Sequence, residues 1–153
     1  GPGEDAPGGG GAEALDLAEA VERGSDYGAA KAQSIAFEDD VEDILRAEGV
    51  CYERFARVAH LRTDFLVRAV DPASGTERKV ALECKAAIRG RYTVALGQAM
   101  ILKALPGVDA VVLCVPYRKN FDAHVLDTFA AQGVPVATPD TLTGHLEAVL
   151  GEG

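Results

Sequence analysis

The residues whose types and spacing best suit chemistry in this chain are two acids and one amine. Eighteen residues separate Asp64 from the triplet Glu83-Cys84-Lys85. Side chains alternate along an extended strand, so Glu83 and Lys85 would face one side and Cys84 the other. Two neighbouring carboxylates repel each other unless a cation lies between them. We therefore expect Asp64 and Glu83 to share a divalent ion beside the Lys85 ammonium, and oxygen ligands favour Mg²⁺ or Mn²⁺.

A β-hairpin would bring these residues together. The stretch Asp71-Pro72-Ala73-Ser74-Gly75 has the composition of a turn, because proline presets one backbone angle and glycine accepts a positive one. The turn joins a strand that begins near Asp64 to a strand that carries Glu83. One face of the second strand is expected to be core, and the other to carry the charges. Charges among aliphatic residues are costly, which indicates that they have a function.

The hydrophobic periodicity and the helix-stop signals predict the remaining elements. A long helix covers residues 29–48 and a first strand covers 50–58. After the hairpin, helices and strands alternate: helix 93–105, strand 109–116, helix 121–132, strand 134–138 and helix 141–150. Hairpin strands followed by helix-linked strands predict an α/β fold, with a mixed central sheet flanked by helices.

The amino-terminal part of the chain differs in composition from the rest. Residues 1–11 are rich in glycine and predict disorder, and residues 12–28 predict a short acidic helix and a linker suited to a protein partner. The folded domain is expected over residues 29–153. Gly1-Pro2 resembles a scar left by a protease, so native residues are expected to precede it. With no apolar run of membrane-spanning length and no signal peptide, we expect no membrane association and a cytoplasmic location.

The net charge of −9 is unevenly distributed. Residues 1–53 hold fourteen acids and three bases, residues 54–121 hold five acids and twelve bases, and residues 122–153 hold five acids and no base. The middle segment, which contains the candidate site, is therefore basic. A polyphosphate partner such as DNA would be attracted to this segment and repelled by the two ends. The acidic ends are also explained by solubility alone.

The pattern of motif, strand and flanking helices resembles the PD-(D/E)XK nuclease superfamily. The resemblance covers residues 33–116 and includes Phe37-Glu38 on the first helix and Gln98 on the helix after the motif. Within the superfamily, the chain looks most like small Holliday junction resolvases and Mrr-like or mismatch-specific endonucleases. Thr63 stands where the superfamily motif has a proline. The resemblance implies a restriction-endonuclease-like fold.

The resemblance also implies a function and a set of roles. The chain would be a Mg²⁺- or Mn²⁺-dependent endodeoxyribonuclease of DNA repair, recombination or restriction, and it is expected to act as a homodimer. Asp64, Glu83 and the backbone carbonyl of Cys84 would hold the metal, while Lys85 would orient water or stabilise developing charge.

The resemblance implies further site residues as well. Glu38 would complete the metal shell, and Gln98 would position Lys85 or a phosphate. The nucleic-acid backbone would be held by Arg89, Arg91, Arg118 and Lys119.

Each of these residues also has a plainer interpretation, which the sequence leaves open. Glu83 and Lys85 could form an exposed ion pair on an edge strand. Asp64 could be an ordinary strand-start residue, Glu38 a solvated helix residue and Gln98 a hydrogen-bonded buried amide. The arginines could be solvated side chains without a ligand.

The sequence leaves a second class of function open. The chain could be a catalytically silent nuclease-like domain that binds nucleic acid or protein within a larger assembly, with the acidic helix engaging a protein partner. A nucleotide-binding domain is disfavoured, because no glycine-rich phosphate loop follows a strand. A zinc finger is disfavoured, because the three cysteines lack the required spacing.

Overall fold

A computed structural model describes residues 26–88 and 90–151. The chain divides into two compact units, residues 1–36 and residues 37–153, and the fold described below is that of the second unit. The predicted disordered leader, most of the predicted acidic helix and Arg89 lie outside the described residues. The described part of the chain contains no helix that is both long and apolar enough to cross a membrane.

The elements follow the predicted order, with ends shifted by a few residues at most places. The first described helix is α2 (Asp26–Glu48), which begins three residues before the predicted start. The elements after it are β1 (Cys51–Val58), β2 (Leu61–Val70), β3 (Glu77–Cys84), α3 (Tyr92–Ala104), β4 (Ala110–Cys114), the short 3₁₀ helix η1 (Arg118–Asn120), α4 (Ala123–Ala131), β5 (Val136–Ala137) and α5 (Leu142–Leu150).

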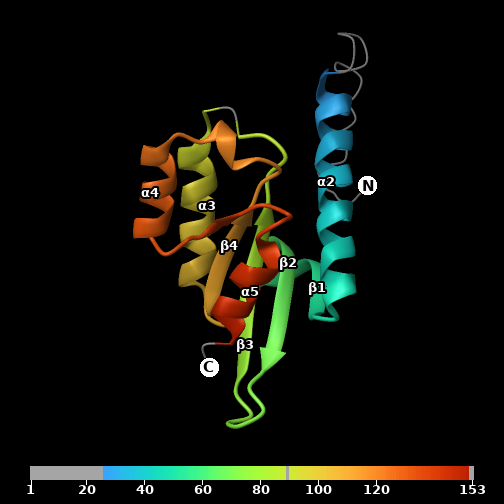
Figure 1. Cartoon of the computed structure of the whole chain (residues 1–153), viewed down its shortest axis with the longest axis vertical. Helices are drawn as coiled ribbons and strands as arrows, with labels where there is room; N and C mark the ends of the chain where they lie inside the picture. The colour runs from blue at the N-terminus through green and yellow to red at the C-terminus, as the bar shows by residue number, and fades with distance from the viewer. Residues whose placement is uncertain (1–25, 89, 152–153) are drawn as a thin grey trace. The chain divides into compact units, whose positions relative to one another are not determined.

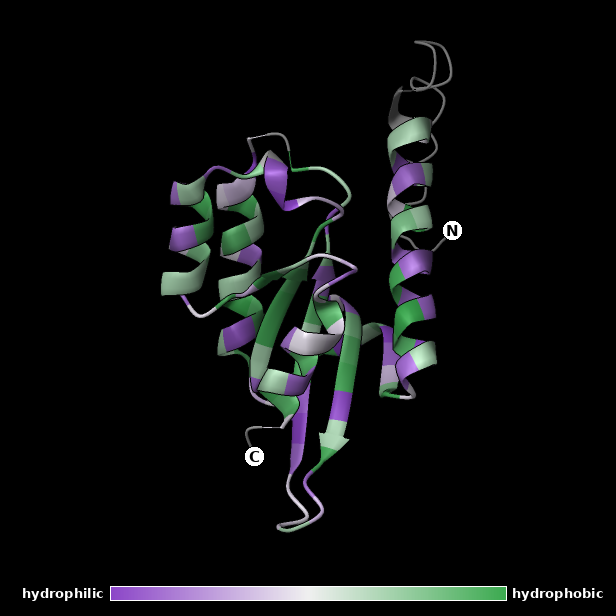
Figure 2. Ribbon diagram, viewed as in Figure 1, coloured by the Kyte–Doolittle hydropathy of each residue, from purple (hydrophilic) through white to green (hydrophobic). Residues whose placement is uncertain are grey.

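The described strands form one mixed sheet in the order β1-β2-β3-β4-β5 (Figure 1). β1 pairs with β2 and β2 with β3 in antiparallel fashion, whereas the β3–β4 and β4–β5 pairs are parallel. β4 consists only of apolar residues and is green along its length in Figure 2, as expected for a strand covered on both faces. The predicted α/β class and mixed sheet are therefore confirmed.

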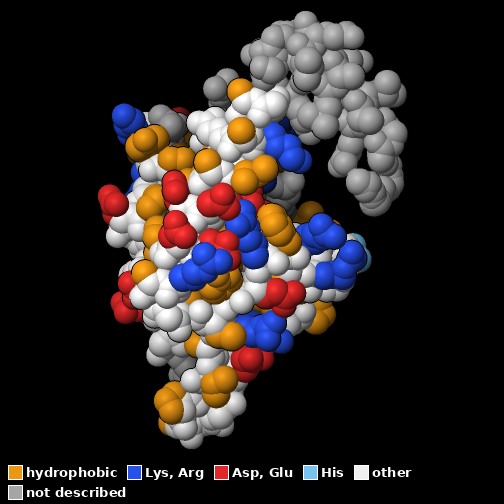
Figure 3. All heavy atoms as spheres, turned by 90° about the vertical axis from the view of Figure 1, so that its right-hand side faces the viewer, with side chains coloured by type: hydrophobic (Ala, Val, Ile, Leu, Met, Phe, Trp, Pro, Cys, Tyr) orange, Lys and Arg blue, Asp and Glu red, His pale blue; other side chains and the backbone are white. Residues whose placement is uncertain are grey.

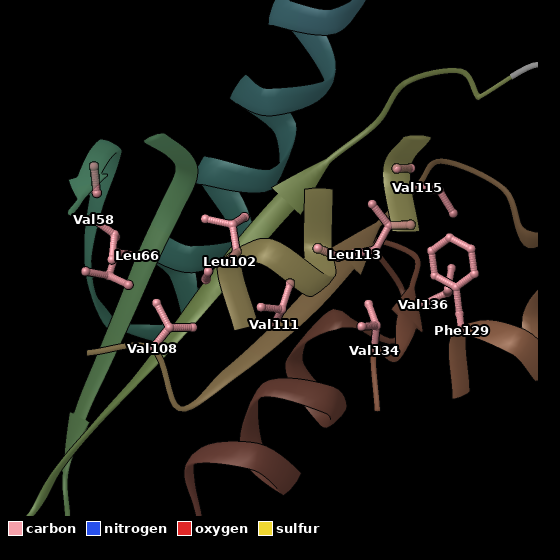
Figure 4. Packing of buried hydrophobic residues seen from close by; sticks show 14 of the residues in the cluster. Val58, Leu66, Leu102, Val108, Val111, Leu113, Val115, Phe129, Val134 and Val136 are labelled. Carbon is pink, nitrogen blue, oxygen red and sulfur yellow. The ribbon is translucent and has the colours of Figure 1, made fainter. Parts of the chain in front are cut away.

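One face of the sheet packs against α3 and α4, which lie side by side in Figure 1. The close view in Figure 4 shows Leu102 of α3 and Phe129 of α4 directed at the aliphatic side chains of the strands. Ala81 of β3 is fully buried in this cluster. This face of the sheet is therefore a hydrophobic core.

The other face packs against the second half of α2 and against α5. Phe37, Val41 and Leu45 repeat at helical spacing and are buried on it, as the periodicity predicted. On β3, Val80, Leu82 and Cys84 point into this cluster. The expectation that only one face of β3 is core was wrong, because helices cover both faces and the charged residues are confined to the two ends of the strand.

The predicted turn between β2 and β3 is confirmed. Gly75 has a φ of +71°, and its N–H donates to the carbonyl of Asp71 at 2.8 Å. The Asp71 carboxylate accepts hydrogen bonds from the backbone N–H of Ala73 and from the hydroxyl of Ser74. The turn thus fixes the register of the hairpin that leads to Asp64 and Glu83.

A capping interaction at α4 gives a test of the fold. Asp122 is the N-cap of α4, and its Oδ1 accepts from the N–H of Val125 at 2.9 Å. We expect Asp122→Ala to lower the free energy of unfolding by about 1 kcal/mol, because one helix donor loses its partner. Asp127→Ala, an exposed change on the same helix, is the matched control in urea denaturation. Equal losses for the two variants would contradict the capping role.

Candidate functional site

The site lies where β2 separates from β3. The backbone pairing of these strands ends at Phe65↔Leu82, and beyond it side chains take the place of the ladder. Asp64 Oδ2 accepts from the N–H of Cys84 at 2.8 Å, and Glu83 Oε2 accepts from the N–H of Asp64 at 3.1 Å. Each acid therefore satisfies a backbone donor of the opposite strand, and the two carboxyl groups are neighbours, as the hairpin register predicted.

Thr63 holds the Glu83 carboxylate from a second direction. Its hydroxyl donates to Glu83 Oε2 at 2.9 Å, and both residues are buried, with exposed fractions of 2% and 9%. A proline in this position would have no hydroxyl to donate. The departure from the superfamily motif at Thr63 thus coincides with a hydrogen bond inside the site.

Burial dominates the electrostatics of the two acids. Desolvation raises the pKa of Asp64, while the Cys84 N–H and the charges of Lys85 and Arg54 partly oppose the rise. The pKa of Glu83 is also raised, first by burial and then by the nearby charge of Asp64. The site therefore holds two carboxyl groups that repel each other and are poorly solvated, a state that a bound cation relieves.

Lys85 follows β3 directly and lies close to both acids. Its charge lowers the pKa of Asp64 and of Glu83. Within the described part of the chain, however, its ammonium makes no ion pair shorter than 4.0 Å. The side chain lines a hollow of about 230 Å³ together with Arg91 and Gln98. The ammonium is thus available to a ligand.

Glu38 lies on α2 near the two acids, and Arg54 of β1 binds it. Arg54 Nη2 donates to Glu38 Oε1 at 3.4 Å, and Nη1 contacts Asp39 and Glu42 at 2.8 Å each. The pKa of Glu38 is raised, mainly by burial and then by the charge of Asp64, which places Glu38 in the electrostatic field of the site. Acidic and basic side chains are intermingled over the middle of the face in Figure 3.

The donor set for a metal is limited. Among residues 26–88 and 90–151, no three His, Cys, Asp or Glu side chains are gathered closely enough to hold an ion. Asp64 and Glu83 are bound to each other's strand, whereas Glu38 is paired with Arg54. Two of the predicted metal ligands, Asp64 and Glu83, are therefore neighbours at the end of the β2–β3 ladder, and the metal roles of Asp64, Glu83, the Cys84 carbonyl and Glu38 stay predictions.

The other predicted residues are spread around the same edge of the sheet. Gln98 is exposed on α3, so the alternative that it is a buried amide does not hold. It does share the hollow with Lys85, as does Arg91. Arg118 and Lys119 are exposed on η1, which follows the parallel strand beside β3. Parallel strands end at one edge, so these cations leave the sheet on the Lys85 side.

Sequence reasoning did not identify Arg54, Phe55 or Thr63. Arg54 contacts the faces of Phe55 and Phe65 as well as the three acids of α2. Only a partial signal for Arg54 was available, because β1 carries two arginines next to an acidic helix and the sequence does not show which of them pairs with the helix. Nothing in the residue type of Phe55 predicts its backbone conformation, which is left-handed.

Comparison with known proteins leaves the chain without a family assignment. No protein-family model matches it, and no curated protein is significantly similar to it. The functional conclusion therefore depends on the geometry of the site.

The burial of Glu83 makes a prediction about pH. The folded state keeps a proton on Glu83 at pH values where the unfolded state has lost it, so burial costs stability as the pH rises above the ordinary pKa of 4.5. In EDTA, we expect the free energy of unfolding to fall less between pH 5 and pH 7.5 in Glu83→Gln than in the wild type. Urea denaturation measures both, with Glu147→Gln as an exposed control. Equal pH slopes for Glu83→Gln and the wild type would refute the effect of burial.

Proposed function

We propose that this chain is a metal-dependent endonuclease that hydrolyses phosphodiester bonds in DNA, with the restriction-endonuclease-like fold of the PD-(D/E)XK superfamily. The observation that carries the proposal is the end of the β2–β3 ladder, where the half-buried Asp64 and the buried Glu83 are bound to each other's strand, next to Lys85, whose ammonium has no ion pair within the described residues. Two desolvated acids of like charge cost stability and need a reason to be kept together.

The acids fit a hard divalent cation. Asp64 Oδ2 and Glu83 Oε2 are used by hydrogen bonds within the hairpin, and among the described residues Asp64 Oδ1 and Glu83 Oε1 accept none. Together with the Cys84 carbonyl, these two oxygen atoms would hold Mg²⁺ or Mn²⁺. A bound ion of this kind polarises a phosphate and lowers the pKa of water. The backbone N–H groups and Thr63 keep the carboxylates oriented while they do this.

Lys85 supplies the positive charge that phosphate chemistry needs. Lys85 is half-buried, its charge acts on both acids, and it lines the hollow that Arg91 and Gln98 also line. From there it would donate hydrogen bonds to a phosphate oxygen and stabilise the charge that develops on it. Gln98 lies beside it as a neutral donor and acceptor.

DNA is the partner that the charge distribution favours. The segment 54–121 holds twelve bases against five acids. Arg91, Arg118 and Lys119 are exposed along the edge that carries Lys85, where they would contact the phosphate backbone. A domain of this size covers little duplex alone, so a homodimer is part of the proposal.

Removal of the amine tests the mechanism. We expect Lys85→Ala to lower the rate of DNA cleavage in Mg²⁺ or Mn²⁺ by about 10²–10³-fold, because a preorganised positive charge is lost. Lys79→Ala, on the same hairpin but paired with Glu77 at 3.6 Å, is the matched control and should cleave like the wild type. The measurement is a time course on four-way junction, mismatched duplex, plain duplex and single-stranded DNA.

Two outcomes would count against this mechanism. Cleavage at the wild-type rate by Lys85→Ala would remove the amine from it. Cleavage that persists in EDTA would remove the metal from it. Circular dichroism of both variants shows whether a loss of activity is instead a loss of folding.

A second candidate function is a catalytically silent nuclease-like domain that binds nucleic acid or protein. The specific observation in its favour is that Arg54 holds Glu38, so within residues 26–88 and 90–151 no third carboxylate joins Asp64 and Glu83.

Calorimetric titration with Mn²⁺ separates the two functions. A nuclease should show a site that is weakened at least tenfold in Glu83→Ala, because one of its two acidic ligands is lost. Glu53→Ala, an exposed acid on β1, is the control. A silent domain should show no saturable binding that depends on Glu83.

A further inference from the structure

Phe55 has a backbone conformation that its residue type disfavours. Its φ is +55°, in the left-handed region that a bulky side chain rarely occupies. Ala59 also has a positive φ, but it lies in the two-residue turn between β1 and β2, where such angles are common. Phe55 lies inside β1, where no turn accounts for it. Strain of this kind persists at functional sites when the surroundings enforce it.

The strand changes faces at Phe55. Arg54 points to the α2 side of the sheet, where it binds the acids of that helix. Ala56, two residues on, is fully buried in the cluster on the opposite face. In a regular strand these two side chains would share a face, so the left-handed residue between them causes the switch. As a result, Phe55 projects from the sheet with an exposed fraction of 54%.

Phe55 is the neighbour of Asp64 across the β1–β2 pair. The flanking pairs Arg54↔Phe65 and Ala56↔Thr63 place Phe55 opposite Asp64 in the sheet. The Arg54 guanidinium lies 4.9 Å from the centre of the Phe55 ring and also binds Glu38. The ring is therefore one strand away from the proposed metal ligand and is supported by an immobilised cation.

A pair of like charges lies beyond Phe55 on the same hairpin. Arg57 and Arg62 are direct partners in the register, and both are exposed. Opposed like charges destabilise a strand pair, and within the described part of the chain neither arginine has an ion pair. An anion that bridged them would remove the repulsion. The phosphate groups of a nucleic acid that ran from Asp64 along β1 and β2 would supply this negative charge.

We propose that Phe55 is a stacking platform for an unpaired nucleobase, with the adjacent phosphates held by Arg57 and Arg62. The inference deepens the proposed function and rests on it: the favoured substrates are DNA molecules that contain unpaired nucleotides next to the cut, such as gaps, flaps or mismatches. Every base has a π-face that stacks on an aromatic ring, and a stacked base in such a site is worth about 1–3 kcal/mol.

The surroundings favour a base over an apolar protein surface. The exposed neighbours of Phe55 along β1 are Glu53 and Arg57, so the ring is an isolated aromatic group among charges. Protein-docking patches are continuous apolar areas. A single ring with Arg54 against its face and Arg57 two residues away instead matches the alternation of base and phosphate in a single strand.

The test measures binding without cleavage. Fluorescence anisotropy in EDTA gives the affinity of the full chain for a continuous duplex and for the same duplex with a three-nucleotide gap. We expect Phe55→Leu to lower the ratio of gapped to continuous affinity by about 5- to 100-fold, because leucine has no π-face. Phe55→Tyr should restore the ratio. Val70→Ala, an exposed apolar residue at the other end of β2, is the control.

Three results would overturn the inference. The first is an unchanged ratio in Phe55→Leu. The second is an equal loss in Phe55→Tyr and Phe55→Leu. The third is a change of oligomeric state in Phe55→Leu by analytical ultracentrifugation, which would make the ring a contact with a second copy. Binding in EDTA requires neither metal nor turnover, so failure of the nuclease proposal leaves this readout intact.

Discussion

The structure depends on an exchange of hydrogen bonds between β2 and β3. Where the backbone ladder stops at Phe65↔Leu82, the carboxylates of Asp64 and Glu83 accept the N–H groups that the ladder leaves unpaired. Buried backbone donors need partners, so the two acids are structural even before any ligand arrives. The same bonds hold them at close range, which creates a requirement for positive charge.

Two cationic side chains of the protein partly neutralise the acids, and the proposed divalent ion would be a third positive charge. Lys85 lowers the pKa of both acids from the end of β3. Arg54 on the neighbouring strand pairs with the charged carboxylate of Glu38 and also lowers the pKa of Asp64. A divalent ion would be the third, at the oxygen atoms that the hairpin leaves free. Each of the two carboxylates therefore uses one oxygen atom to maintain the hairpin and, within the described residues, leaves its other oxygen atom for a ligand.

The elements and the meeting of the two acids were predictable because they depend on local signals. The turn at Asp71–Gly75 sets the hairpin register, and the register alone places Asp64 opposite Glu83. The apolar run of β4 predicted a covered central strand. The burial of both faces of β3 was missed, because alternation on one strand does not reveal which helices will cover it.

The contacts of Arg54 and the backbone conformation of Phe55 could not be predicted from local signals. Arg54 meets Glu38 only through the packing of α2 on β1, a contact between residues sixteen positions apart. The left-handed angle of Phe55 opposes the preference of its residue type, so a reading of composition assigns an ordinary strand there. Residues whose backbone conformation opposes the preference of their residue type are found only from a structure, and such residues are common at functional sites.

The kink at Phe55 also affects how the molecule meets copies of itself. β1 is the edge of the sheet, and an unpaired edge invites another strand to extend it. A left-handed residue in mid-strand interrupts the flat row of donors and acceptors that such an addition requires. We therefore expect the conformation that turns the aromatic ring outward also to disfavour the addition of a further strand at this edge.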